Sequence, residues 1–571
     1  MSSLGLRKDI MEDNIGTDGK MEEAAELPSG GFKDQNSTED PKLRHPFLIL
    51  LAAFGAAVLV DVLFFGKMWG WHWAVTVNLY LAVVLLIARL EGKKLPLSSI
   101  TLIALTSLSA LLTGFRSAFA TVSSLILFSG LGMLLVTVSL LNGQWLQFRI
   151  RELIGGLFKL IPSGVIGTPL LIFEAIQLSQ ENKEQAPDKR RVGKAILRGV
   201  LITIPLLLIF GILLTAADAI FSNMLGNAFD WLKFDAFEDL IPQTLIILLL
   251  TWFGAAALWH AFSKSGKILA IQPDKPLVKP FLGMTETSIA LISLNLLFAF
   301  FLVVQFRYFF AGSANISIDG FTYAEYARRG FFELVTVAVI AGILYFALAS
   351  FTRRDTTAKK RAFSVMAGLL LAQVGVMLIS AFQRLRLYEQ AYGFTSSRLA
   401  AHVFMIFIGL LLLALIIMEL TNSFRKLGLV LVLGLMAFGL VLFGINEDGL
   451  IARLNLEMAM KGGNLDTTYL VFGLSNDAVP TFFQIYDQPD LDPAMREKLK
   501  MILACGYANF QEEYADYPWQ STTISTYTAG KLYQEHEEVL RGVLNQLNDA
   551  DSSIDIDGRT IWCSGLPEYQ P

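Results

Sequence analysis

Long apolar runs separated by short polar segments make up most of this chain. A helix needs about 20 apolar residues to cross the roughly 30 Å hydrocarbon core of a bilayer, and about eleven runs approach that length. They lie near residues 47–65, 71–90, 97–115, 122–141, 196–216, 241–262, 287–306, 331–351, 362–382, 400–419 and 427–445. The pattern predicts an all-α integral membrane protein, a bundle of about eleven transmembrane helices over residues 46–445.

One further apolar segment, near residues 153–178, does not fit this pattern as well. Lys159, Pro162, Pro169 and Glu174 interrupt it, so it could instead form a re-entrant or an interfacial segment. We interpret it as an amphipathic helix on the cytoplasmic side of the membrane.

Composition agrees with a membrane protein and excludes several other classes. The chain is 54% hydrophobic and only 17% charged, whereas soluble domains are usually about 25% charged. The net charge of −4 is small, and no basic patch is interleaved with aromatic residues, so we expect no nucleic-acid partner. Membrane lipids are the partners that this composition requires.

Polar segments predict how the chain is oriented. Residues 1–45 are polar and lean acidic, so we expect a disordered cytoplasmic tail without a signal peptide. Every second loop is basic, and basic loops normally stay in the cytoplasm. The basic segments are 42–44, 89–94, 183–194, 264–279, 353–361 and 425–426. The alternation predicts a cytoplasmic N-terminus and an extracytoplasmic C-terminus in a bacterial cell membrane.

Residues 446–571 differ from the preceding spans because they are acidic and polar. Amphipathic patterns near 495–509 and 528–548 predict a small, soluble, helical extracytoplasmic domain. Both cysteines of the chain, Cys505 and Cys563, fall within it. A disulfide would suit an oxidising compartment, but two unpaired thiols are equally compatible with the sequence.

The polar segment between the seventh and eighth spans, TYAEYARRGFFEL, is the first candidate site. On a helix Glu325, Arg329 and Glu333 stack along one face, and Arg328 lies beside them. Other polar residues are predicted to lie at the same outer membrane face. They are Arg307 and Tyr308 after the seventh span, and Arg384, Arg386, Tyr388 and Glu389 after the ninth.

Two interpretations of this outer arginine cluster remain open. Arginine suits planar, bidentate contacts to carboxylate or phosphate, which favours a pocket for an anionic small molecule or lipid. Alternatively, Arg328, Arg329 and Arg384 pair with Glu325, Glu333 and Glu389 and lock helices together, as charges within membranes commonly do.

Polar residues within the predicted spans form a second set of candidates. Asp61 in the first span and Asp218 at the end of the fifth are candidates for ion coupling, although structural hydrogen bonding is an equal alternative. For the remaining ones we favour hydrogen bonds between helices. These are Asn295, Gln373, His260 and His402.

No motif for catalysis or metal binding stands out. There is no nucleophile elbow, no convincing Ser-His-Asp arrangement and no His/Cys spacing typical of zinc. We therefore expect no enzymatic activity, no cofactor and no metal site.

Several blocks of the chain resemble one family of bacterial polytopic membrane proteins. They are LTAADAIF from Leu214, QFRYFFAG from Gln305, TYAEYARRGFFEL, RLRLYEQAYGFTSSR from Arg384, NLDTTYL from Asn464 and LSNDAVP from Leu474. The family is designated DUF4153, with DUF4173 a close relative, and the similar blocks span roughly residues 200–480. The resemblance implies a membrane location and a multi-helix architecture, but it implies no activity.

Two classes of function follow from these observations. The first is a transporter or lipid-handling protein that binds an anionic group at the outer arginine cluster. The second is a non-transporting membrane scaffold or sensor, whose C-terminal domain binds an envelope protein. A polar cavity reaching the membrane midplane would favour the first class, and a solid apolar core with paired arginines would favour the second.

Overall fold

The computed structural model of the chain describes most of the residues that follow the N-terminal tail. These are residues 43–65, 67, 70–147, 150–181, 214, 237–266, 280–310, 331–421, 426–514, 518–545, 553–556 and 559–563. All of them belong to one compact unit that extends from Lys42 to Pro571. The predicted tail and the predicted span near 196–216 lie outside these residues.

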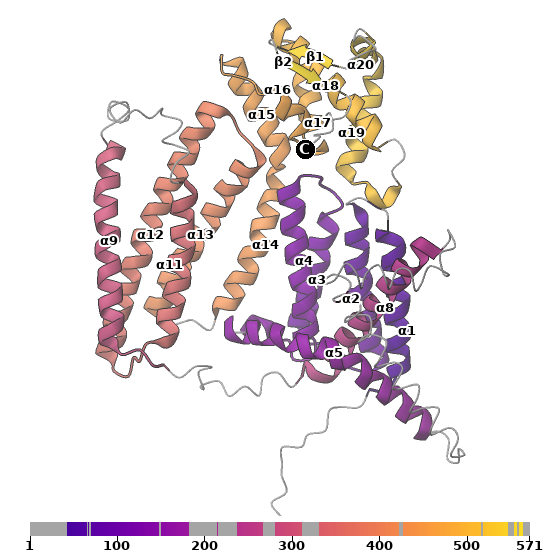
Figure 1. Ribbon diagram of the computed structural model, residues 1–571, viewed down its shortest axis with the longest axis vertical. Helices are drawn as coiled ribbons and strands as arrows, with labels where there is room; N and C mark the ends of the chain where they lie inside the picture. Colours follow the sequence, from indigo (N-terminus) through magenta and orange to yellow (C-terminus); the bar gives the residue numbers. More distant parts are fainter. Residues whose placement is uncertain are drawn as a thin grey trace, which may run out of the picture. The chain divides into compact units, whose positions relative to one another are not determined.

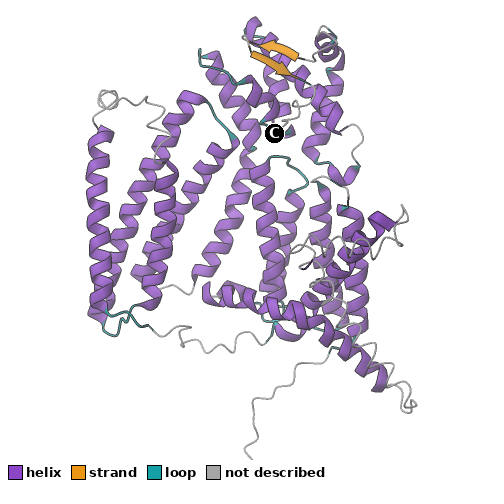
Figure 2. Ribbon diagram, in the orientation of Figure 1, coloured by secondary structure: helices purple, strands orange, loops and turns teal. Residues whose placement is uncertain are grey.

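Long apolar helices dominate the described part of the chain, which confirms the all-α membrane bundle (Figure 2). Ten described helices are long and apolar enough to cross a membrane, and the shorter helix α3 is also apolar. The helices that lie over predicted spans are α1 (Pro46–Phe64), α2 (Trp71–Leu90), α3 (Leu97–Leu112), α4 (Phe119–Ser139), α8 (Phe237–Trp259), α9 (Met284–Phe310), α11 (Phe331–Phe351), α12 (Thr357–Tyr392), α13 (Ser396–Thr421) and α14 (Leu427–Ile445).

Helix α5 (Ile150–Glu181) covers the segment that the sequence left ambiguous. Its stretch Gly155–Leu178 is long and apolar enough to span a membrane. However, α5 runs across the ends of neighbouring helices instead of alongside them (Figure 1). It packs against α8, α1 and α4, and Pro162 and Pro169 lie inside it. This orientation favours the interfacial interpretation of the sequence, because a spanning helix is expected to run alongside its neighbours.

Three basic segments that the structure describes, at 43–44, 89–94 and 353–361, gather at one end of the bundle (Figure 1), which we call the basic end. There Glu91, just after α2, accepts hydrogen bonds from the backbone N–H groups of Arg44 (2.9 Å) and His45 (2.8 Å), directly before α1. At the same end, the chain before α9 pairs with the chain after α11 through Leu282 and Thr352. Within these two pairs, α1 with α2 and α9 with α11, the helices therefore run in opposite directions, as predicted for consecutive spans.

Two apolar cores hold the membrane helices together. One is formed by α1–α5, α8 and α14, and the other by α9 and α11–α14. Helix α14 packs on both α4 and α13 and so joins the two halves. Close packing of α3 and α4 depends on Gly132, where a Cβ would lie 2.2 Å from Oγ1 of Thr106.

Helices at the other end of the bundle form a cluster that we call the C-terminal cluster (Figure 1). It consists of α15 (Glu447–Met460), α16 (Thr467–Phe472), the short turn η7 (Asn476–Ala478), α17 (Val479–Tyr486), α18 (Pro493–Tyr514), η8 (Trp519–Ser521), α19 (Ile524–Glu535) and α20 (Glu537–Leu544). The cluster has its own apolar core. Cys505 and Cys563 form a disulfide within that core.

Two details of this cluster differ from the sequence prediction. The helix predicted near 528–548 is divided between α19 and α20, because the chain leaves helical geometry at His536. An antiparallel hairpin of β1 (Ser553–Ile556) and β2 (Arg559–Trp562) was not predicted. The hairpin consists of two strands of only four residues each, and four residues are too few to establish an alternating pattern.

Candidate functional site

The outer arginine cluster is only partly within the described residues. Glu325, Arg328 and Arg329 lie outside them, and so do the side chains of Arg307 and Tyr308 in α9. Glu333 is exposed in the first turn of α11. The stacked acid–base–acid face therefore stays a prediction.

The part of this cluster on α12 makes several contacts that the sequence did not predict. Nη2 of Arg384 donates to Oε1 of Gln305 in α9 at 2.8 Å. Glu389, expected to pair with an arginine, lies 3.2 Å from Nδ1 of His402 and is buried. The Tyr388 ring faces the guanidinium of Arg398, which follows α12, at 4.4 Å. Arg386 is exposed.

The intramembrane candidates that the structure describes lie in different surroundings. Asp61 is buried in the last turn of α1, near the helix end and not at its middle. Nδ2 of Asn295 donates to the Met366 carbonyl at 3.0 Å, and Gln373 donates to the Asn295 carbonyl at 3.2 Å. These bonds join α9 to α12, as predicted for amides between helices. Asp218 lies outside the described residues.

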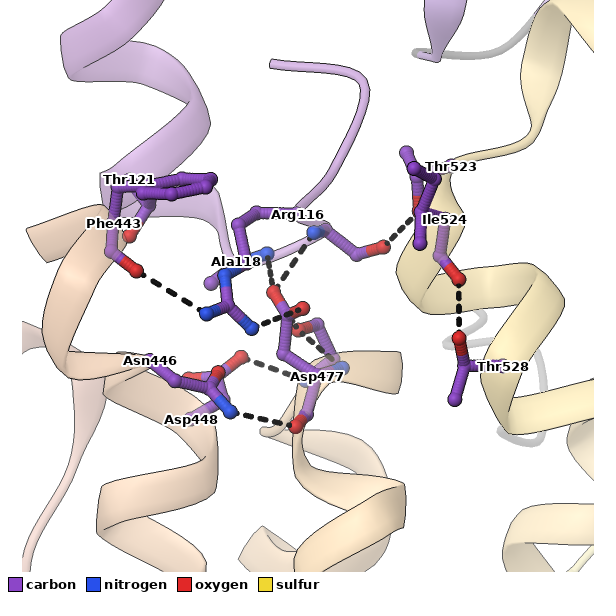
Figure 3. Close-up of polar contacts among 12 residues, drawn as sticks. Arg116, Ala118, Thr121, Phe443, Asn446, Asp448, Asp477, Thr523, Ile524 and Thr528 are labelled. Atoms are coloured by element: carbon purple, nitrogen blue, oxygen red, sulfur yellow. Dashed lines mark hydrogen bonds and ion pairs between the residues drawn. The ribbon is translucent and has the colours of Figure 1, made fainter. Parts of the chain in front are cut away.

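The most elaborate polar site is the junction between the C-terminal cluster and the membrane helices (Figure 3). Oδ2 of Asp477, in η7, accepts hydrogen bonds from the backbone N–H groups of Ser117 and Ala118, both at 2.8 Å. These residues directly precede α4, where N–H groups lack helical partners and the helix dipole favours negative charge. Asp477 therefore caps a membrane helix from a distant part of the chain.

Arg116 connects the same carboxylate to a second membrane helix. Its Nη1 lies 3.6 Å from Oδ1 of Asp477, and its Nη2 donates to the Phe443 carbonyl of α14 at 3.3 Å. The guanidinium also lies 5.2 Å from the centre of the Phe443 ring. Asp477 is buried at 2% exposed, whereas the Arg116 side chain is 25% exposed, so only the carboxylate side of this pair is shielded from solvent and screening salt.

Two more carboxylates lie at the junction where α14 passes into α15. Glu447 is fully buried, and its Oε2 accepts a hydrogen bond from Oγ1 of Thr121 at 3.1 Å. Burial, together with the charges of Asp448 and Asp477, raises the pKa of Glu447 to about 7. Burial also raises the pKa of Asp448, whose carboxylate accepts bonds from Ser396 (2.8 Å) and the Ser475 N–H (2.9 Å).

Asn446 makes the sharp turn that brings these carboxylates together. It adopts a left-handed conformation with φ of 50°, which asparagine tolerates better than most residues. Its Nδ2 donates to the carbonyl of Asp477 at 3.4 Å (Figure 3). The chain therefore leaves the membrane in a direction fixed by the same residues that cap α4.

Two cavities adjoin this junction. The larger, about 510 Å³, lies within the C-terminal cluster, and the smaller, about 150 Å³, reaches Trp73 of α2 and Ile126 of α4. Both are lined by Ser117, Glu513 and Tyr514. The larger volume is within the ~300–1,000 Å³ of typical small-molecule sites.

The sequence analysis did not assign any role to these junction residues. Asp477 was noticed only as part of the block LSNDAVP, and Arg116 lay in a short loop between two spans. A serine followed by an acidic residue and a proline does indicate a helix start. However, that signal does not reveal that Asp477 caps α4, which lies about 360 residues earlier in the chain.

A family model for a domain of unknown function, DUF4153, matches residues 97–484. The chain belongs to the DUF4153 family. The match begins at α3. It therefore includes α3 and α4, two predicted spans that precede the sequence blocks resembling this family. It includes Arg116, the α14–α15 turn and Asp477. No curated protein and no solved structure matches the chain.

The carboxylates of this DUF4153 protein do not form a metal centre in the described part of the chain. No three His, Cys, Asp or Glu side chains come close enough there to share an ion. Arg116 already balances part of the negative charge. The arrangement is suited to holding two parts of the protein together and to responding to protonation.

Glu447 gives a testable pH dependence. Its pKa in the folded protein is above the ordinary value of 4.5, so protonation of Glu447 stabilises the folded state. This stabilisation is complete below about pH 4.5 and is lost as pH rises through about 7. Glu447→Gln should remove this dependence and stabilise the protein near neutral pH, by at most about 3 kcal/mol.

The measurement is the thermal unfolding midpoint of purified protein across this pH range. Glu457→Gln, at a partly exposed position on the same helix, is the control and should retain the pH dependence of the wild type. Parallel curves for the wild type and Glu447→Gln would contradict the assignment of the titration to Glu447.

Proposed function

We propose that this protein handles lipids, binding an amphipathic molecule in the cavities at the junction. The observation that carries this proposal is that the two cavities share three lining residues. One cavity is lined mainly by helices of the C-terminal cluster, and the other reaches membrane helices α2 and α4. A molecule with a polar head and an apolar chain would match such a pair of sites.

The residues around the cavities support this choice of ligand. Apolar walls are supplied by Leu470, Phe482 and Ile502, whereas hydroxyl groups of Thr523 and Thr526 line the smaller cavity. Glu513 is also present, and Arg116 already faces Asp477. A head group bound through hydrogen bonds fits better here than a simple anion. The anionic ligand expected at the outer arginine cluster is a separate proposal.

The proposal places the basic end in the cytoplasm and the C-terminal cluster outside the cell membrane of a bacterium. Positive charge at the basic end supports this orientation. The disulfide supports it as well, because such bonds persist in oxidising compartments. The proposed role is binding and transfer, with no catalytic step.

A scaffold or sensor is the second candidate. It is favoured by exposed aromatic side chains on the C-terminal cluster, Trp519 (59% exposed) and Tyr527 (74% exposed). Such residues are common at protein interfaces, so an envelope protein could bind there. A sensor of this kind would not require the junction cavities to accept a lipid.

The function is tested by filling the larger cavity. Asn509→Trp introduces a large side chain at a lining residue of α18, whereas Gln511→Trp places the same side chain at an exposed position outside the lining. A fluorescent lysophospholipid should bind to the wild type and to Gln511→Trp. Its affinity for Asn509→Trp should fall by about tenfold or more, because the bulky ring excludes the ligand.

Binding is measured by fluorescence anisotropy in detergent, and unfolding midpoints verify that both variants fold. Equal affinities for the three proteins would contradict a lipid site in the cavity. That result would favour the sensor, for which partners of Trp519 and Tyr527 would be sought.

Orientation is tested by labelling single introduced cysteines on intact cells. Lys461→Cys follows α15 in the C-terminal cluster, and Lys360→Cys lies at the basic end; both positions are exposed. A membrane-impermeant maleimide should label Lys461→Cys on intact cells and Lys360→Cys only after lysis. The reverse pattern would show that the proposed topology is inverted.

A further inference from the structure

A groove at the basic end, far from the junction, has the features of a second binding site. It lies between α5 and the end of α8 and has a volume of about 440 Å³. Its polar lining comes from Lys159, Ser163, His260 and Lys264. Among the described residues that line it no carboxylate occurs, so the charges that they contribute are positive and would attract an anion.

The backbone is adapted at this point to present two of these side chains. Helix α8 ends in a π-helical turn, His260–Lys264, and such turns are frequent at functional sites. The turn brings Nζ of Lys264 to 5.5 Å from the centre of the Trp259 ring. This contact holds the lysine against the wall of the groove instead of letting it extend into solvent.

His260 supplies the second, independent observation. Its side chain is only 2% exposed, and its Nδ1 lies 2.7 Å from Oγ of Ser163 on α5. Its Nε2 is buried and has no hydrogen-bond partner among the residues that the structure describes. Buried polar atoms are normally satisfied, so an unpartnered one in a binding groove is a reason to expect a ligand there.

The remainder of the groove is apolar. Ile166 (52% exposed) and Leu170 (38% exposed) extend its wall along α5, and Trp259 forms the opposite side. Glu174, further along α5, accepts a hydrogen bond from Nε1 of Trp259 at 3.3 Å and does not line the groove. A cationic end and an apolar wall are therefore combined within one site.

We infer that this groove binds an anionic phospholipid from the leaflet at the basic end. The phosphate lies between Lys159 and Lys264, and the Nε2–H of His260 donates a hydrogen bond to it. In this tautomer Nδ1 of His260 accepts the hydrogen bond from Oγ of Ser163. An acyl chain follows Ile166 and Leu170. The crosswise orientation of α5 supports a lipid over a soluble phosphate, because an interfacial helix lies at the level of the head groups (Figure 1). This site is independent of the proposed junction site.

The test removes two charges at the groove and two elsewhere at the same end. Lys159→Gln with Lys264→Gln alters the groove, and Lys93→Gln with Lys94→Gln is the matched control. Native mass spectrometry counts the phosphatidylglycerol retained by full-length protein released from mixed phosphatidylglycerol and phosphatidylcholine nanodiscs. We expect the groove variant to lose its preference for phosphatidylglycerol by about tenfold or more, since each lysine near an anionic surface contributes to binding.

A third variant, Ile166→Trp, obstructs the apolar wall and leaves every charge in place. Two results together would support a lipid. Ile166→Trp should retain less phosphatidylglycerol than the wild type, and excess inorganic phosphate should leave retention by the wild type unchanged. Equal retention by the groove and control variants would overturn the proposal. Displacement of the lipid by inorganic phosphate, together with normal retention in Ile166→Trp, would assign the groove to a soluble anion and would also overturn it.

Discussion

The arrangement of the C-terminal cluster on the membrane helices depends on one carboxylate, that of Asp477. It accepts two backbone hydrogen bonds at the start of α4 and faces Arg116, which in turn bonds to the end of α14. A buried charge of this kind is costly unless it is paired and hydrogen-bonded. Removing it would leave both Arg116 and the N-terminus of α4 without a counter-charge.

The neighbouring carboxylates make this junction sensitive to its surroundings. Glu447 and Asp448 are buried beside Asp477, and burial together with the charge of Asp477 disfavours ionisation of both. The pKa of Glu447 is raised to about 7. Protonation near neutral pH would therefore change the charge of the residues that connect α14 to the cluster. Ser117 belongs both to this network and to the two junction cavities, so a ligand there would contact residues that fix the cluster in place.

Sequence patterns predicted the membrane helices well because hydrophobic length is a strong physical requirement. The same reasoning failed for polar contacts, which depend on the three-dimensional arrangement. Glu389 was expected to pair with an arginine, but it meets His402 on the neighbouring helix, and no spacing rule indicates this. The role of Asp477 was missed for the same reason. In contrast, Asn295 was correctly predicted to bond between helices, since an amide within a span has few other partners.

The central claim is that Asp477 couples the cluster to the membrane helices, and hydrogen exchange tests this most directly. Asp477→Ala would be compared with Asp487→Ala, an exposed acidic residue of the same cluster whose side chain is 57% exposed. The account predicts faster exchange in Asp477→Ala at the start of α4 and across the α14–α15 turn, with no such change in Asp487→Ala. Faster exchange confined to residues 474–480, with α4 and α14 unaffected, would contradict it.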